Sequence, residues 1–377
     1  MRFSKRASAS FVALLGGSSA LLGGCGSDQT GALGFSSLGF STTQVYFGAP
    51  LPLTSEQAGF SPSVSPPYSD VYAFPRHLQL PYTLQWNISI EQAIGKEQSF
   101  TLSYVGSNGR RQIGQQERAL SKSAFEYINL FVGGISSNYQ SLQAKFQRSI
   151  GHGIQGIASY TWSHSIDYGS TYQSFLPLLR GNSDFDLRSD FSAGWSWEIP
   201  GSSSQRLLNA VFDGWAVDGR FNARSGFPIV LRGNLTVDPV TGAIYYSGLD
   251  RAPNVPVYLY GTQFPGSRAL NPAAFTLPAA GIVAGNSPRN FVRGFGAIQS
   301  NLALRRELPF HRNLRLQFRA EAFNLPNHPS FGYIDPILTD ATFGQATQML
   351  NQSLGTVAPQ YQQGGPRSLQ FALKLLF

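Results

Sequence analysis

The sequence has 377 residues but a single cysteine, Cys25, so an internal disulfide is excluded. Charged residues make up only 13% of the chain, about half the usual share for globular domains. Aromatic residues make up another 13%, and few charges combined with many aromatics argue against disorder. Beyond the N-terminal segment, no stretch approaches the ~18 apolar residues that a membrane-spanning helix needs.

Motifs for catalysis and cofactor binding are also missing. None of the five histidines has a histidine or cysteine partner at a zinc spacing, and no Gly-x-Ser-x-Gly nucleophile elbow occurs. Asp184, Asp186 and Asp190 alternate in one loop without the glycine and terminal glutamate of a calcium-binding loop, which favours a salt-bridged loop. The net charge of +8 is not gathered into a basic stripe with a nucleic-acid-binding motif. We therefore expect a non-enzymatic protein with no cofactor, no metal site and no nucleic-acid partner.

What the sequence does contain is a repeated alternation of apolar and polar residues. Alternate side chains of a strand point to opposite faces, so each such segment predicts a strand with one apolar face. Segments of about ten residues suit a tilted strand that crosses a bilayer, although a soluble β-sandwich would show the same period. The alternating segments are 82–91, 100–104, 142–147, 154–163, 191–199, 215–224, 314–322 and 369–377.

The connections between these segments differ in length at the two ends. Those at 95–96, 151–153, 200–212 and 309–312 are short, whereas those at 107–138, 165–189, 226–296 and 325–366 are long. Outer-membrane barrels have short periplasmic turns and long external loops, and a 70-residue loop would be unusual in a compact soluble domain. We therefore expect an all-β, antiparallel outer-membrane-type β-barrel over residues 82–377, located in the outer membrane. Nine strands follow from residue 82, and one near 42–47 would make about ten.

The last strand carries the sharpest alternation. Its apolar positions are Leu369, Phe371, Leu373, Leu375 and Phe377. A lipid-facing strand that ends on an aromatic residue is typical of the strand that closes an outer-membrane barrel. We expect these five residues to form the signal for the barrel-assembly machinery and the chain to end in the periplasm.

The first 81 residues differ in composition from the rest. A basic start, an apolar stretch and the sequence Leu22-Gly-Gly-Cys25 predict a signal peptide over 1–25. This segment also resembles a bacterial lipoprotein signal, which makes Cys25 a candidate for lipidation. Residues 26–81 are rich in Gly, Ser and Pro, which indicates a linker or loop, with 42–47 as a candidate for one strand.

Two further groups of side chains follow from the predicted faces. Five tryptophans fall on apolar faces and suit an interfacial aromatic girdle, with ordinary core packing as the alternative: Trp86, Trp162, Trp195, Trp197 and Trp215. Five charged residues fall on the opposite face: Arg305, Glu307, Arg315, Arg319 and Glu321. They predict a wall of ion pairs inside the lumen, and contact with a plug domain or an anionic solute is the alternative.

Several stretches, in this order, resemble a known family. They are 80–92 (LPYTLQWNISIEQ), 102–109 (LSYVGSNG), 138–143 (NYQSLQ), 158–167 (ASYTWSHSID) and 319–324 (RAEAFN). This series resembles the C-terminal barrel region of Oar-like TonB-dependent receptors of the acidobacterial type, from about residue 70 to the end.

The resemblance implies a 22-stranded outer-membrane barrel that is filled by a plug and powered through an energy-coupling box. The chain departs from that pattern because it shows no plug, no coupling box and about ten strands. We therefore expect a truncated homologue with a role in solute uptake or surface binding. A TonB-type energy coupler would be a partner only if a plug is supplied elsewhere. Ten strands could close as a small barrel or remain a fragment with exposed edges. A lipid-anchored adhesion protein and a secreted soluble β-sandwich are the alternative functions.

Overall fold

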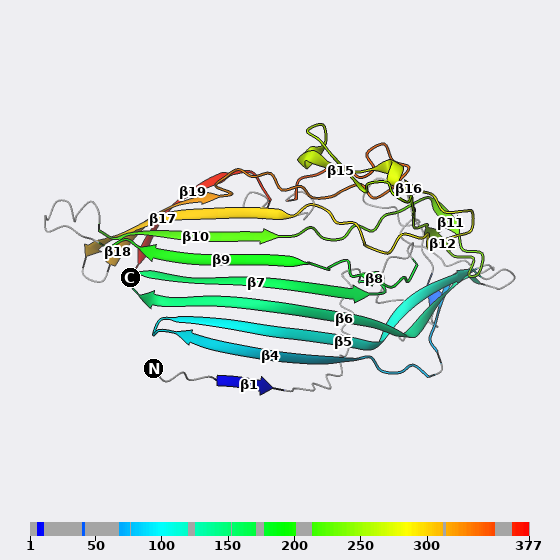
Figure 1. The fold of residues 1–377 in the computed structure, drawn as a ribbon, viewed down its shortest axis with the longest axis horizontal. Helices are drawn as coiled ribbons and strands as arrows, with labels where there is room; N and C mark the ends of the chain where they lie inside the picture. The colour runs from blue at the N-terminus through cyan, green and yellow to red at the C-terminus, as the bar shows by residue number, and fades with distance from the viewer. Residues whose placement is uncertain are drawn as a thin grey trace, which may run out of the picture.

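The computed structural model describes residues 6–10, 40–41, 68–75, 77–119, 125–151, 153–170, 177–200, 213–311, 314–350 and 364–376. Most of them form one large sheet of 13 strands, with irregular loops gathered at one end (Figure 1). Two short 3₁₀ turns, Pro265–Ser267 and Pro272–Ala274, interrupt these loops. Over the described ranges, no helix is long and apolar enough to cross a membrane.

Nine strands of the sheet follow one another in chain order, and each pairs antiparallel with the next. They are β4 (Tyr82–Ile94), β5 (Gln98–Ala119), β6 (Phe125–Gly151), β7 (Ile154–Asp167), β9 (Ser189–Glu198), β10 (Trp215–Arg224), β17 (Ala297–His311), β18 (Leu314–Phe323) and β19 (Ser368–Leu376). This up-and-down order confirms the predicted all-β, antiparallel fold and the nine strands expected from residue 82.

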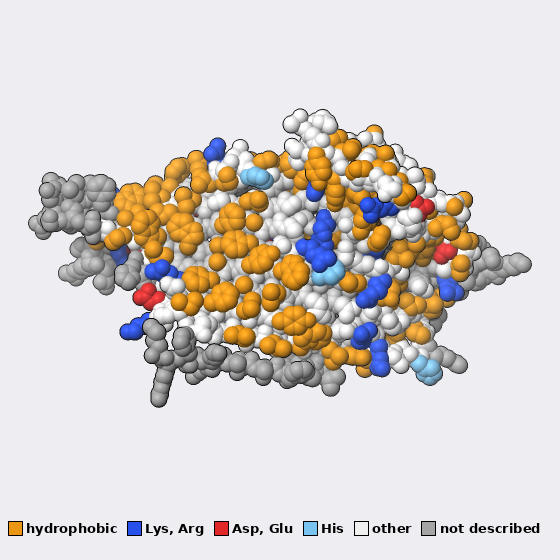
Figure 2. All heavy atoms as spheres, viewed as in Figure 1, with side chains coloured by type: hydrophobic (Ala, Val, Ile, Leu, Met, Phe, Trp, Pro, Cys, Tyr) orange, Lys and Arg blue, Asp and Glu red, His pale blue; other side chains and the backbone are white. Residues whose placement is uncertain are grey.

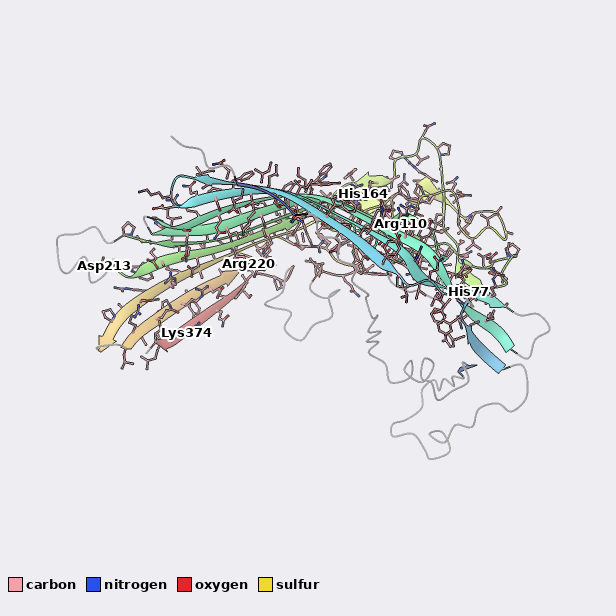
Figure 3. The ribbon with its side chains drawn as sticks, turned by 90° about the horizontal axis from the view of Figure 1, so that it is seen from below. His77, Arg110, His164, Asp213, Arg220 and Lys374 are labelled. Carbon is pink, nitrogen blue, oxygen red and sulfur yellow. The ribbon has the colours of Figure 1, made fainter. Side chains whose placement is uncertain are left out.

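The sheet is curved (Figure 3), and within the described residues its two edges do not pair with each other. Within the described residues, β19 pairs only with β18. At the other edge, β4 pairs with β5 and with the short strand β1 (Arg6–Ser10), which covers Asn87 to Glu91. The structure therefore presents part of a barrel wall rather than a closed ring.

The connection expected at 107–138 is wrong, because β5 and β6 continue through it as one long hairpin. Their pairing extends to Ala119 and Tyr127, with irregularities between Gly109 and Gly114. Beyond the neighbouring strands, side chains on both faces of this hairpin are mostly half-buried, and Phe131 packs against Tyr72 and Phe74, so no single face needs to be apolar. Side chains there vary without a clear period, which is why the alternation disappears while the strands go on.

Strands also occur in the segment expected to be a linker. β3 (Tyr68–Ala73) pairs parallel with the outer part of β6 and antiparallel with β2 (Phe40–Ser41). The strand expected near 42–47 lies outside the described residues, as do Cys25 and Phe377. The predictions of a signal peptide and of lipidation at Cys25 therefore stay predictions.

The hydrophobic core lies in the loops. Residues 226–296 and 325–350, here called the loop unit, bury Leu249, Leu270, Ala274, Phe275, Val292 and Phe343 against one another. Three two-stranded sheets build this unit. Their strands are β11 (Leu235–Val237), β12 (Ile244–Tyr246), β13 (Asp250–Arg251), β14 (Tyr258–Tyr260), β15 (Arg268–Leu270) and β16 (Phe275–Thr276). The large connections expected from the sequence are thus folded.

Candidate functional site

One face of the large sheet is apolar and uncovered (Figure 2). Phe371 on β19 is 69% exposed, and its neighbours Leu369 and Leu373 are equally open. Other exposed residues on this face are Leu84, Ile88 and Ile90 of β4, Leu102 and Tyr104 of β5, Leu142 and Phe146 of β6, Leu304 and Leu308 of β17, and Phe318 of β18. A continuous apolar surface of this size is not stable in water, whereas lipid chains would cover it. No second sheet of the described part lies on it, as a soluble sandwich would require.

The tryptophans on this face lie at two levels. Trp197 is paired with Ile154 near the short turns. Trp162, which is 56% exposed, follows Ile154 by eight residues along β7, or about 26 Å at ~3.3 Å per residue. Aromatic girdles flank an apolar band about 25 Å tall in outer-membrane barrels. The spacing agrees with the girdle interpretation, which stays a prediction.

Two of the tryptophans lie flat on glycines of the neighbouring strand. Trp86 is paired with Gly106, and Trp195 is paired with Gly219. A Cβ atom on either glycine would overlap the indole ring. The glycines therefore allow these rings to cover the exposed backbone of the sheet.

The opposite face carries a network of ion pairs centred on Asp218 of β10. One carboxylate oxygen of Asp218 accepts from Arg319 Nη1 at 2.6 Å, and the other accepts from Ser196 Oγ at 2.7 Å and Arg305 Nε at 3.3 Å. The side chain is only 23% exposed. Asp218 therefore ties β9, β17 and β18 to β10.

All five charged residues expected on this face join the same network. Arg305 and Arg315 each lie 3.3 Å from Glu307, and Arg319 lies 3.2 Å from Glu321. With Asp218 and the outlying Glu198, four carboxylates compensate three guanidinium groups. This balance supports the ion-pair wall over a site for an anionic solute. That the face lines a lumen stays a prediction.

A second network attaches the loop unit to the connection between β7 and β9. Fully buried Asp186 accepts from the backbone N–H of Ser165 at 2.7 Å and from Arg293, and it lies 3.1 Å from His164 Nδ1. Burial raises the pKa of Asp186, but these hydrogen bonds outweigh it and hold the pKa below its usual value. The loop therefore carries a charged carboxylate as its anchor.

Arg289 makes a parallel attachment. Its guanidinium lies 2.7 Å from Asp167 and 2.6 Å from Asp184. The aspartate-rich loop is thus salt-bridged. Across the described residues, no three histidine, cysteine, aspartate or glutamate side chains gather as metal ligands.

A search with protein-family models matches residues 25–370 to the outer membrane beta barrel domain. The chain belongs to the outer membrane β-barrel domain family. This result agrees with the exposed apolar face and places the protein in the outer membrane. Among curated proteins, no sequence relative was found.

Several solved structures resemble this outer membrane β-barrel domain at low identity. The outer membrane transporter YddB from Escherichia coli aligns with a TM-score of 0.44 and 10% identity, over 83% of this chain and 34% of YddB. The pyoverdine receptor FpvA from Pseudomonas aeruginosa PAO1 gives 0.40 and 13%, over 80% of this chain and 30% of FpvA. The copper transporter OprC gives 0.34 and 11%, over 80% and 33%. The barrel domain thus spans about a third of the length of these proteins.

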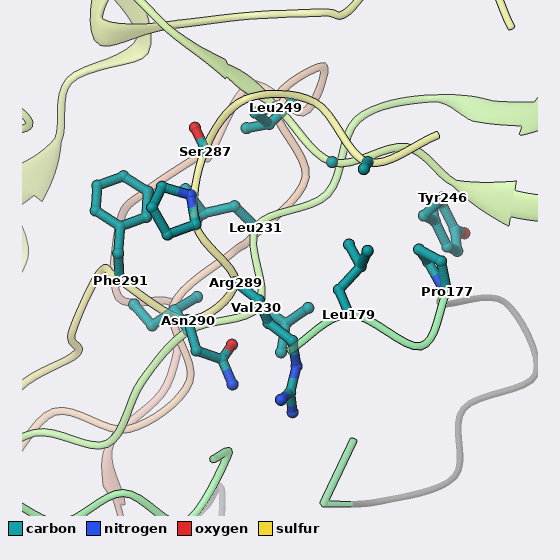
Figure 4. Close-up of a pocket in the computed structure, with 14 residues that line it drawn as sticks. Pro177, Leu179, Val230, Leu231, Tyr246, Leu249, Ser287, Arg289, Asn290 and Phe291 are labelled. Carbon is teal, nitrogen blue, oxygen red and sulfur yellow. The ribbon is translucent and has the colours of Figure 1, made fainter. Parts of the chain in front are cut away.

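The barrel domain also has a small pocket of about 60 Å³ between the loop unit, which forms most of its wall, and Pro177 and Leu179 of the connection after β7 (Figure 4). Leu179, Leu231 and Phe291 form part of its wall. The Ser287 hydroxyl and the Asn290 side-chain oxygen are buried there without a protein partner. This volume suits ordered water molecules rather than a solute.

Sequence reasoning missed two features of the barrel domain. The sequence pattern put Asp218 on the polar face of its segment, but its place at the centre of the ion-pair network depends on which strands lie next to β10. Arg289 and Arg293 lie more than 100 residues from their aspartate partners. No local signal in the sequence could have paired them.

Proposed function

We propose that the chain forms part of the wall of a receptor-type outer-membrane barrel and serves solute uptake or surface binding without chemistry of its own. The observation that carries this proposal is an open sheet with one lipid-compatible face, one face of compensated charges, and a folded loop unit at one end. The Oar-like receptor type suggested by the sequence belongs to this proposal. Loops held on a rigid scaffold commonly carry recognition, so the loop unit is the proposed binding surface.

The direction of the edge strands supports a barrel completed by further strands. Since nine strands alternate in direction, β4 and β19 run the same way. Joining them directly would create a parallel pair, whereas outer-membrane barrels are antiparallel. Unpaired edges are also costly in hydrocarbon, because lipid cannot hydrogen-bond the backbone. An odd number of additional strands would satisfy both edges.

β1 indicates how such a strand would lie. This five-residue strand pairs antiparallel with the middle of β4, and no other described residue pairs with Tyr82 to Trp86 on that side. β1 lies within the predicted signal peptide, so removal of that peptide would leave this edge of β4 open to another strand. The proposed partners are outer-membrane lipid, the barrel-assembly machinery and, only if a plug comes from elsewhere, a TonB-type energy coupler.

Fractionation of cells that express the chain tests the proposal. We expect the protein in the outer membrane, resistant to carbonate washing. A soluble periplasmic monomer without detergent would contradict it and favour the secreted sandwich. Palmitate labelling that is lost in Cys25→Ser would favour the lipid-anchored alternative.

A disulfide test addresses the edges. Ile88→Cys on β4 and Leu373→Cys on β19, in a Cys25→Ser background, should not cross-link within one membrane-embedded chain, because further strands separate them. The matched control pairs Ile88→Cys with Tyr104→Cys, since these residues are direct cross-strand neighbours. A cross-link between the β4 and β19 cysteines of one chain would show that nine strands close alone.

A further inference from the structure

The apolar face has a basic border at the loop end of the sheet. Arg110 is paired with Tyr82, so it shares the face that carries Leu84, Trp86 and Ile88. Arg111 has a positive φ of 55° and lies with its guanidinium carbon 5.4 Å from the centre of the Tyr82 ring. The irregularity in β5 therefore brings two successive arginines to one side of the sheet, where strict alternation would separate them.

A third arginine joins them from the connection after β7. Arg180 donates to Asn138 Oδ1 at 2.9 Å and to Ser136 Oγ at 3.1 Å, both on β6. Asn138 is paired with Asn108, two residues before Arg110. Arg110 and Asn138 are therefore diagonal neighbours, and such side chains lie about 7–8 Å apart. Because Arg180 binds Asn138, the three guanidinium groups can reach one headgroup.

These arginines lack the compensation seen elsewhere. Of the ion pairs within the described residues, none includes Arg110, Arg111 or Arg180. All three side chains are exposed. On the charged inner face, by contrast, Arg305 and Arg319 each meet two or more carboxylates.

The position of the border fits the lipid headgroups. Tyr82 lies four residues beyond Trp86 on β4, about 13 Å along the strand from the upper aromatic level. Figure 2 shows basic side chains where the apolar surface gives way to the loops, and in Figure 3 Arg110 and His164 lie near the middle of the molecule, on the loop side of Lys374. Lipid chains on the apolar face would therefore bring their headgroups to these guanidinium groups.

We propose that Arg110, Arg111 and Arg180 bind the phosphate groups of the glycolipid, lipopolysaccharide, that forms the outer leaflet of the outer membrane. Guanidinium groups match phosphate oxygens with a planar fork, and the rings of Tyr82 and Tyr168 hold two of them in place. Leu84 and Tyr104, below them, offer contact to the acyl chains. The site goes beyond the proposed function, and it requires only that the loop end faces outward.

Binding of lipid A tests the site. The full chain in detergent is titrated with lipid A in mixed micelles of the same detergent and phosphatidylcholine, and bound lipid is measured. An arginine near an anionic membrane surface contributes about fivefold in affinity, so the triple change to glutamine should weaken binding about 100-fold. Arg→Lys at the same three positions should restore only part of the binding, because the charge is kept but the planar fork is lost. Arg220→Gln, an exposed arginine on the opposite face, should have no effect.

Three results would overturn the proposal. The triple variant could bind lipid A as tightly as Arg220→Gln, which would leave the three arginines without a role. Equal binding of dephosphorylated lipid A would show that phosphate is not recognised. Full displacement of lipid A by millimolar inorganic phosphate would indicate a site for the free anion rather than for a lipid. An unchanged far-UV circular dichroism spectrum of each variant in detergent confirms that a loss of binding is not a loss of folding.

Discussion

Replacing Asp218 by asparagine tests whether the network on the charged face holds four strands together. Both carboxylate oxygens of Asp218 accept hydrogen bonds, one from Arg319 and the other from Arg305 and Ser196. Asparagine has nearly the same shape, but it offers one acceptor and one donor. Its amide nitrogen must then face a guanidinium group that has only donors.

The expected loss follows from these contacts. One charge-assisted hydrogen bond disappears, which typically removes about 1.5–3 kcal/mol. Because Arg305 keeps Glu307 and Arg319 keeps Glu321, neither guanidinium is left without a carboxylate. We therefore expect the free energy of unfolding to fall by about 2 kcal/mol.

Urea titration of the refolded chain in lipid vesicles, followed by tryptophan fluorescence, measures this change. Glu198→Gln is the matched control, because Glu198 is 65% exposed and lies 3.6 Å from Arg305. It should change the free energy of unfolding by less than about 0.5 kcal/mol. If Asp218→Asn and Glu198→Gln prove equal, the network does not stabilise the sheet.

Three further changes test other parts of the molecule. Gly219→Val should displace the tryptophan that lies over it and destabilise the sheet by about 1–3 kcal/mol, whereas Gly194→Ala, with open space around its Cβ, should not; unfolding curves compare them. Asp186→Asn should loosen one of the two attachments of the loop unit and speed its proteolysis at pH 7, while the ion pairs of Arg289 stay in place. Because the pKa of Asp186 is lowered in the folded protein, its contribution to the stability of the loop unit is present above the unfolded pKa of about 3.9 and is lost as the pH falls through the folded pKa. Pepsin should therefore cut the wild type faster only below about pH 4. Equal proteolysis of variant and wild type at pH 7 would refute the role of Asp186 as an anchor. Phe371→Arg should reduce carbonate-resistant membrane insertion, since arginine at mid-bilayer costs about 2–4 kcal/mol, whereas Lys374→Gln on the opposite face should insert normally.

The sequence predicted those strands whose two faces lie in different environments. β4, β7, β10 and β18 each alternate because one face is apolar and the other is polar. The short turns between them were equally readable. This information is local, so no knowledge of distant contacts was required.

The parts that sequence reasoning missed depend on contacts between distant segments or on a uniform environment. The outer halves of β5 and β6 are mostly half-buried on both faces, so their sequence carries no period. The core of the loop unit joins Leu270 to Phe343, from connections on either side of β17 and β18. Asp218 becomes central only because β9 and β17 flank β10.

The long hairpin of β5 and β6 also determines how far part of the loop unit lies from the rest of the sheet. Beyond Arg110, the last residue of β5 that faces β4, the strand runs nine residues to Ala119, or about 30 Å. There the N–H of Ala119 donates to the carbonyl oxygen of Thr241 in the loop unit at 2.7 Å. The hairpin thus connects the sheet to part of the loop unit about 30 Å beyond Arg110. In the proposed orientation, with the loop end outward, an antibody or a phage fibre that approaches the cell would meet this surface before it reached the membrane.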